Sequence, residues 1–329
     1  MYSLSDSPLL GRLMPRQTRY STAHRVVVLL VMIFVTDFIA TIPMYMLFTS
    51  ATGDTLRALL QGVANGSVSE QMYTEAIMTL SETMSGSVAG ILCCLWGTAA
   101  TIGGCVLFVR LEEGKPLSAA GLSERPKRAV PGYLAGALAG LLMMGAAVGL
   151  LVLLKAVTVG RANGNLLVLC LLAVGYGIQG MAEEFLFRGV LLTWFLGDGR
   201  RNPWIALTLS AGLFALAHVG NNGFSILAFL NIMLFGLLTG LLTFRTGSVY
   251  AAAGLHSLWN FAEGCVFGIS VSGLATTDSI LSCVFVPGKT LSTGGAFGIE
   301  GGFATTLVFL VALLLLLFVP KKKEKPVVL

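Results

Sequence analysis

The stretch Met181-Ala-Glu-Glu-Phe-Leu-Phe-Arg-Gly189 places two adjacent carboxylates and an arginine inside an apolar run that covers residues 166–196. An ionised carboxylate at membrane depth costs a few kcal/mol, so it needs a partner or water. On a helix Glu184 and Arg188 face each other, whereas Glu183 points roughly 100° away from them. The pattern predicts a buried ion pair, Glu184 with Arg188, beside a free carboxylate at Glu183.

The composition is that of a polytopic membrane protein. Of the 329 residues, 55% are hydrophobic and 11% are charged, whereas soluble domains carry about a quarter charged residues. The net charge of +5 lies mostly in loops and tails, so it reports membrane orientation and not nucleic-acid binding. The six cysteines lack zinc-finger spacing and predict no disulfide framework.

Eight apolar spans predict an all-α fold, a polytopic transmembrane helix bundle. They cover residues 26–48, 87–108, 132–154, 166–196, 204–220, 224–244, 249–271 and 303–319. The fourth span is longer than a hydrocarbon core of about 30 Å, so we expect it to tilt, to kink near its glycines at 175–180 or to extend into the interface. Five glycines at four-residue spacings in the third span predict close helix packing; they are Gly132, Gly136, Gly140, Gly145 and Gly149.

Lysine and arginine residues predict the orientation of the spans. Five basic segments fall on one side of the membrane, namely the N-terminal tail, the loop 110–130, the turns at 200–201 and 245, and the C-terminal tail. The acidic segment 49–86, which we expect to be a hydrophilic loop, falls on the other side. Both termini are therefore predicted to be cytosolic. Asp37 interrupts the first span and is expected to make a polar contact inside the bundle.

Two of the three histidines lie in apolar spans. His218 stands near the end of the fifth span, and His256 and Asn260, four residues apart, share one helical face of the seventh. Glu183 and His218 are each 15 residues from the turn that joins their spans, so both stand on the order of 22 Å above it. We therefore expect one pocket between the fourth, fifth and seventh spans to hold all four side chains.

These residue types predict a hydrolytic site. A poorly solvated carboxylate can act as a general base near neutral pH, and a neighbouring histidine can orient or deprotonate water. An imidazole and a carboxamide can stabilise a developing oxyanion. No serine or cysteine stands evidently beside a base, so we expect water to be the nucleophile that hydrolyses a peptide bond in the membrane.

Three motifs carry a resemblance to a known family. Glu183-Glu184-x-x-x-Arg188, Phe214-x-x-x-His218 and His256-x-x-x-Asn260 resemble the motifs of the CAAX protease and bacteriocin-processing (CPBP, Abi) intramembrane endopeptidases, relatives of the type II CAAX prenyl endopeptidase. The resemblance covers roughly residues 115–270, including a softer match at residues 117–122.

That resemblance implies a role for each motif residue. Glu183 and His218 would activate the water, and His256 and Asn260 would form the oxyanion site. Glu184 and Arg188 would support the first motif.

The resemblance also divides the chain. Residues 1–24 are a basic cytosolic tail, and residues 25–110 hold two N-terminal transmembrane spans with an extracytoplasmic loop. Residues 111–270 form the protease-like core. Residues 271–329 contain a loop, the last span and a basic tail.

The metal question is open in the sequence, although a metal-free site is favoured. Members of this family are often labelled metalloproteases, and the alternative is a zinc ion held by Glu183, His218 and His256. No helix offers a His-Glu-x-x-His pair, and Asn260 suits an oxyanion better than a soft cation. We therefore expect no cofactor.

Three alternatives to a protease remain. The buried ion pair can serve helix packing alone, or the chain can be a non-catalytic membrane scaffold or immunity protein of the same fold. A proton-coupled transporter is a third, although no internal repeat supports it. The expected partners are the lipid bilayer and a membrane-associated peptide or protein substrate, prenylated or not, and the expected location is a bacterial inner membrane.

Overall fold

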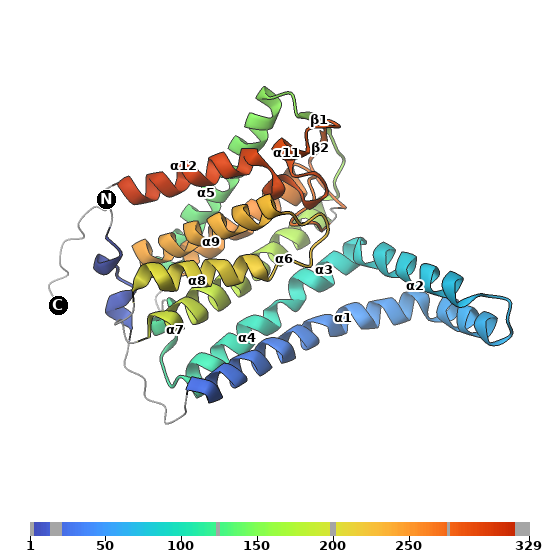
Figure 1. The fold of residues 1–329 in the computed structure, drawn as a ribbon, viewed down its shortest axis with the longest axis horizontal. Coiled ribbons are helices and arrows are strands. Elements are labelled where there is room, and N and C mark those ends of the chain that lie inside the picture. Colours follow the sequence, from blue (N-terminus) through green and yellow to red (C-terminus); the bar gives the residue numbers. More distant parts are fainter. Residues whose placement is uncertain (1–2, 14–21, 123–125, 198–201, 275–276, 320–329) are drawn as a thin grey trace.

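The structure is a computed structural model that describes residues 3–13, 22–122, 126–197, 202–274 and 277–319 (Figure 1). The α-helices in this part are α1 (Thr22–Ala64), α2 (Glu70–Ser85), α3 (Val88–Gly97), α4 (Ala99–Leu107), α5 (Pro126–Leu153), α6 (Leu166–Glu184), α7 (Leu192–Leu196), α8 (Pro203–Leu216), α9 (Ile226–Thr246), α10 (Tyr250–Phe261), α11 (Thr290–Thr293) and α12 (Phe303–Phe318). Three π-helical segments continue α4, α6 and α10; they are η3 (Phe108–Glu112), η5 (Phe185–Leu191) and η6 (Ala262–Val266). Short 3-10 turns are η1 (Leu4–Asp6), η2 (Leu10–Arg12), η4 (Leu117–Ala120), η7 (Gly295–Phe297) and η8 (Ile299–Gly301). The strands are β1 (Val157–Arg161) and β2 (Leu281–Phe285).

The all-α, membrane-spanning architecture is confirmed. Five helical stretches in the described ranges are long and apolar enough to cross a membrane, and α8 and α12 are shorter apolar helices. Each of the eight predicted spans falls on a helix. The number that crosses the bilayer and the side on which the termini lie stay predictions.

Side-chain caps set the starts of α6 and α8, which lead to site residues, and of α9 beside them. The side chains of Asn165, Asn202 and Ser225 accept hydrogen bonds from the first turns of α6, α8 and α9, which satisfies amide groups that a helix start leaves unpaired. Gly247 ends α9 in the left-handed conformation, with φ of 68°, which favours glycine. The local sequence therefore explains these boundaries.

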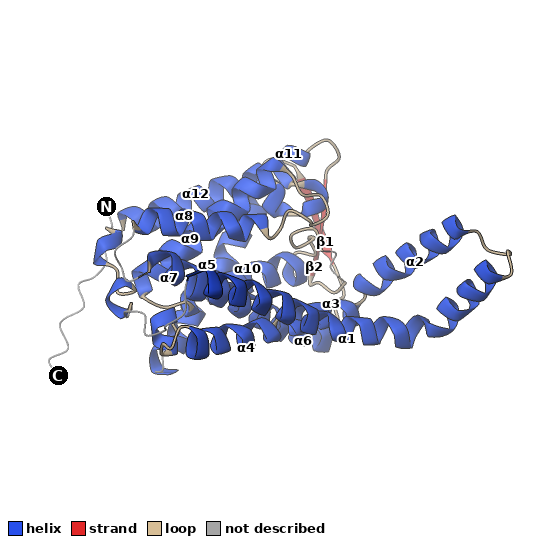
Figure 2. Ribbon diagram, turned by 60° about the horizontal axis from the view of Figure 1, so that its bottom comes forward, coloured by secondary structure: helices blue, strands red, loops and turns tan. Residues whose placement is uncertain are grey.

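The segment 49–86 is not the loop predicted from its polarity. Helix α1 continues to Ala64, and α2 follows after a short turn, so the segment forms a helical hairpin that extends beyond the bundle (Figures 1 and 2). None of the residues of α2 is buried. Hydrophilic composition predicted exposure correctly, but exposed residues also form helices when their propensity is high and a cap such as Ser69 is present.

A two-stranded sheet joins two segments that were predicted as loops. Strands β1 and β2 pair antiparallel, with Val157 opposite Phe285 and Arg161 opposite Leu281. Ile280 and Cys283 donate backbone hydrogen bonds to the carbonyls of residues 265 and 267 at the end of η6. The sheet therefore lies across the bundle end at which α10 finishes (Figure 2).

Helix α10 lies in the middle of the bundle, packed against α5 and α6. A Cβ at Gly136 or Gly140 would collide with the α10 backbone at Ala251 or Leu255, so the predicted packing role of these two glycines is confirmed. For Gly145 and Gly149 that prediction is wrong, because nothing lies within 4 Å of a Cβ built there. The close backbone approach that needs glycine is therefore in the first half of α5.

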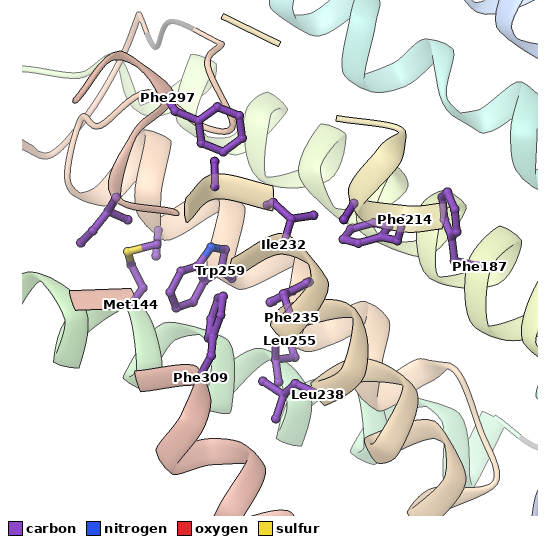
Figure 3. Close-up of a cluster of buried hydrophobic side chains, with 14 of the residues drawn as sticks. Met144, Phe187, Phe214, Ile232, Phe235, Leu238, Leu255, Trp259, Phe297 and Phe309 are labelled. Carbon is purple, nitrogen blue, oxygen red and sulfur yellow. The ribbon is translucent and has the colours of Figure 1, made fainter. Parts of the chain in front are cut away.

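The core of the bundle is aromatic (Figure 3). The rings of Phe235, Trp259 and Phe309 are in mutual contact, with centroid separations of 4.8 to 6.2 Å. Phe214 stacks on Phe235 from the side of α8. This cluster fixes the positions of α8, α9, α10 and α12 around the polar side chains described next.

Both described chain ends lie at one end of the bundle. Ser7 Oγ donates to the Phe244 carbonyl at 2.6 Å, and Arg12 Nη1 donates to the Gly247 carbonyl at 2.5 Å. Arg245 donates to the carbonyls of Leu316 and, at 2.8 Å, Val319. The turn after α9 thus holds the N-terminal segment and the end of α12 together.

Candidate active site

The two glutamates stand where α6 changes its winding. Helix α6 runs without interruption past Gly175 and Gly180 to Glu184, and the π-helical segment η5 follows immediately. The helix is therefore not broken at the glycines, where a kink was one of the three alternatives that the length of this span left open. Gly180 instead gives Ser257 of α10 room to approach, since a Cβ there would collide with it. Single π-helical turns are frequent at functional sites.

Glu184 is the centre of a buried charged group. Its Oε2 lies 3.1 Å from Arg188 Nε, and its Oε1 lies 3.0 Å from His256 Nδ1. Glu184 and Arg188 are fully buried, and His256 is 4% exposed. The carbon of the Arg188 guanidinium also lies 4.4 Å from the centroid of the Phe214 ring. The ion pair predicted from the spacing is present, and it additionally orients a histidine from another helix.

Glu183 points elsewhere and is accessible. Its side chain is 22% exposed and lines a cavity of about 830 Å³. Its Oε2 lies 3.9 Å from His256 Nε2. His256 therefore stands between the two glutamates, hydrogen-bonded to Glu184 through one ring nitrogen and facing Glu183 with the other.

His218 reaches the same cavity from the end of α8. Its Nδ1 lies 2.8 Å from the Phe214 carbonyl, which can only accept, so Nδ1 carries the proton. The Nε2 lone pair is then available in the neutral ring. The Phe214 ring lies against His218 and against His256, with centroid separations of 4.8 and 5.8 Å, so one aromatic side chain positions both imidazoles.

Asn260 lines the cavity one helical turn beyond His256. Its Nδ2 donates to Gln179 Oε1 at 3.3 Å, and its Oδ1 is buried without a hydrogen-bond partner among the described residues. Gln179 also lines the cavity. The sequence reading did not single out Gln179, although its place four residues before Glu183 puts both on one face of α6.

The structure thus brings all six predicted site residues together. Glu183, His218 and Asn260 line the cavity, His256 lies behind Glu183, and the pair Glu184–Arg188 lies behind His256. The cavity is also lined by Asp37 of α1. The prediction of a contact inside the bundle for Asp37 is wrong, because the residue is exposed and has no hydrogen bond or ion pair within the described ranges.

The alternative zinc ligands do not form a metal site in this arrangement. Within the described ranges, no three histidine, cysteine, aspartate or glutamate side chains are grouped closely enough to hold a metal ion. His256 has its Nδ1 engaged with Glu184 at 3.0 Å. A histidine that binds zinc usually donates its other ring nitrogen to a carboxylate, so this contact does not distinguish the metal-free site from the zinc alternative.

Comparisons with known proteins agree with the motif reading. Residues 164–262 match the family model described as type II CAAX prenyl endopeptidase Rce1-like, a range that contains all six site residues. A curated relative, the uncharacterized protein YyaK of Bacillus subtilis (strain 168), is 35% identical over 86 residues, which are 25% of this chain and 28% of that protein. No solved structure matches the chain.

Proposed function

We propose that this chain, whose residues 164–262 match the Rce1-like family model, is an intramembrane endopeptidase that hydrolyses a peptide bond of a membrane-associated peptide or protein. The observation that carries the proposal is the shared cavity. A carboxylate from α6, an imidazole from α8 and a carboxamide from α10 line it together. A concave, mostly apolar space with a few convergent polar groups is typical of a substrate site.

Water activation is assigned to Glu183 and His218. With Nδ1 donating to a carbonyl, His218 can accept a proton on Nε2 as water attacks the carbonyl carbon. Glu183 accepts a hydrogen bond from the same water, which orients the water and helps His218 to take its proton. When the tetrahedral intermediate collapses, the carbon–nitrogen bond breaks and the leaving amine takes that proton.

Oxyanion stabilisation is assigned to Asn260 and His256. Asn260 Nδ2 donates one hydrogen to Gln179 and has a second for the substrate oxygen. His256 uses Nδ1 for Glu184, so its Nε2 donates only when the ring is doubly protonated. In the proposed mechanism His256, which lies between Glu183 and Glu184, is in that doubly protonated form. Glu184 and Arg188 are positioning residues, because they act through His256 and through the helix.

The test is cleavage by the full-length protein in nanodiscs of a peptide library, read by mass spectrometry. Glu183→Gln keeps the shape of the side chain and removes the carboxylate that activates the water together with His218, so we expect cleavage to fall by about 10²- to 10⁴-fold with unchanged thermal unfolding. The matched control is Glu82→Gln, on exposed α2, which should retain full turnover. Wild-type turnover in Glu183→Gln would refute the assignment.

The same assay separates the metal-free mechanism from the zinc alternative. Activity should survive chelation followed by dialysis, and elemental analysis should find well under one zinc per chain. Loss of activity on chelation, with recovery on addition of stoichiometric zinc, would contradict the metal-free site.

A further inference from the structure

The wall of the cavity opposite the catalytic residues comes from helices outside the family match. Helix α1 contributes Val26, Leu30, Ile33 and Asp37 along one face, and residues 98–101 contribute two threonines. On the opposite face of α1, Val35 is exposed. This wall is apolar except for a small polar area around Asp37.

Asp37 stands level with Glu183. It lies 15 residues after Thr22, the first residue of α1, which is about 22 Å along the helix. Glu183 lies 13 residues before Leu196 at the end of α7, about 20 Å from it. The first turn of α1 and the end of α7 lie at the same end of the bundle (Figure 1), so the two carboxylates face one space at one depth.

The charge of Asp37 is not compensated by the described protein. The cavity residues Thr36 and Thr98 donate their hydroxyl hydrogens to backbone carbonyls of their own helices, and within the described ranges no ion pair or hydrogen bond reaches Asp37. Among the described residues that line the cavity there is no lysine or arginine, and the carboxylates are those of Asp37 and Glu183. An uncompensated carboxylate at this depth costs a few kcal/mol, and a cationic group in the cavity would recover that cost.

We propose that Asp37 determines the specificity of this site by binding a basic side chain, lysine or arginine, of the substrate close to the bond that is cleaved. This inference rests on the proposed function only in calling the bound peptide a substrate. The binding of a cationic peptide by Asp37 does not depend on cleavage. The apolar lining holds the hydrophobic residues of the peptide, and Asp37 selects the register that puts a positive charge against α1.

The first arm of the test measures binding without turnover. Two apolar peptides, identical except for a central lysine or norleucine, are titrated into the full-length Glu183→Gln protein in nanodiscs. A charge-assisted hydrogen bond predicts about tenfold tighter binding of the lysine peptide. Adding Asp37→Asn should abolish the difference, and adding Asp37→Glu should keep most of it. The control, Asp54→Asn, changes an exposed aspartate paired with Arg57 and should have no effect.

The second arm profiles cleavage sites in a peptide library with the wild-type active site. We expect lysine or arginine to be enriched at one fixed position near the cleaved bond, and Asp37→Asn to lose that enrichment while retaining cleavage. Equal binding of the two peptides by the Asp37-bearing protein, or an enrichment that persists in Asp37→Asn, overturns the inference. A wild type that binds the lysine peptide selectively but cleaves nothing contradicts the proposed function and leaves the Asp37 site standing.

Discussion

The burial of polar side chains differs between the helices within the family match and the N-terminal helices. In the matched part, Glu184, Arg188 and His256 are buried and in contact with one another. In α1, Asp37 is exposed on the cavity wall. In the most apolar 18-residue window of α9, 56% of the residues are buried, whereas 11% are buried in the corresponding window of α1. The comparison indicates that the matched helices fix the geometry of the proposed active site, whereas the N-terminal helices supply a wall whose chemistry can change without loss of the fold.

The largest expected difference between the two regions is in stability. Glu184→Ala leaves a buried guanidinium without its carboxylate, and breaking a buried pair costs about 3–5 kcal/mol. We expect a much smaller monodisperse fraction in detergent and a lower midpoint of thermal unfolding, and the same for Arg188→Ala. Asp54→Ala, which breaks the exposed pair with Arg57, should change neither. If Glu184→Ala had the same midpoint of thermal unfolding as the wild type, the expected difference in stability between the two regions would be refuted.

The next effect is on turnover alone. Asn260→Ala removes an oxyanion donor, so we expect kcat to fall by about 100- to 1000-fold with little change in KM. The control is Asn222→Ala, an exposed asparagine next to the cavity residue Asn221, which should retain wild-type kcat. A rise in KM at constant kcat would assign Asn260 to substrate binding and not to the transition state.

The smallest effect is expected on the lipid-facing side of α1. Phe34 is 73% exposed, so Phe34→Ala should change the free energy of unfolding by no more than about 0.5 kcal/mol. Phe235, at 3% exposed, touches His256 and Trp259, and Phe235→Ala should cost about 3–5 kcal/mol. Thermal unfolding of both variants in nanodiscs measures the difference. Equal losses would show that the α1 layer is as tightly packed as the matched helices.

Helical period and charge spacing were sufficient to predict the positions of the main helices and the pairing of Glu184 with Arg188. Four-residue spacing acts within one helix and needs no knowledge of the bundle. The hydrogen bond between Glu184 and His256 was not predictable, since it depends on how α6 and α10 rotate about their axes. The π-helical segment η5 changes that rotation further, and the helical period and charge spacing did not predict it. Asp37 was assigned to the interior because sequence does not say which face of α1 meets a cavity.

The pairing of β1 with β2 has a consequence for the order in which the protein is made. Val157 and Phe285 are partners, and the whole of α6 to α10 lies between them in the sequence. Chains emerge from the ribosome N-terminus first, so β1 is exposed while every helix of the site is being synthesised and inserted. Closing so long a loop costs conformational entropy. The hydrogen bonds between β1 and β2 offset that cost only after β2 has been synthesised. A nascent chain that stops before Leu281 therefore carries Glu183, His218, His256 and Asn260 but not the strand that ties the two sides of the bundle end together.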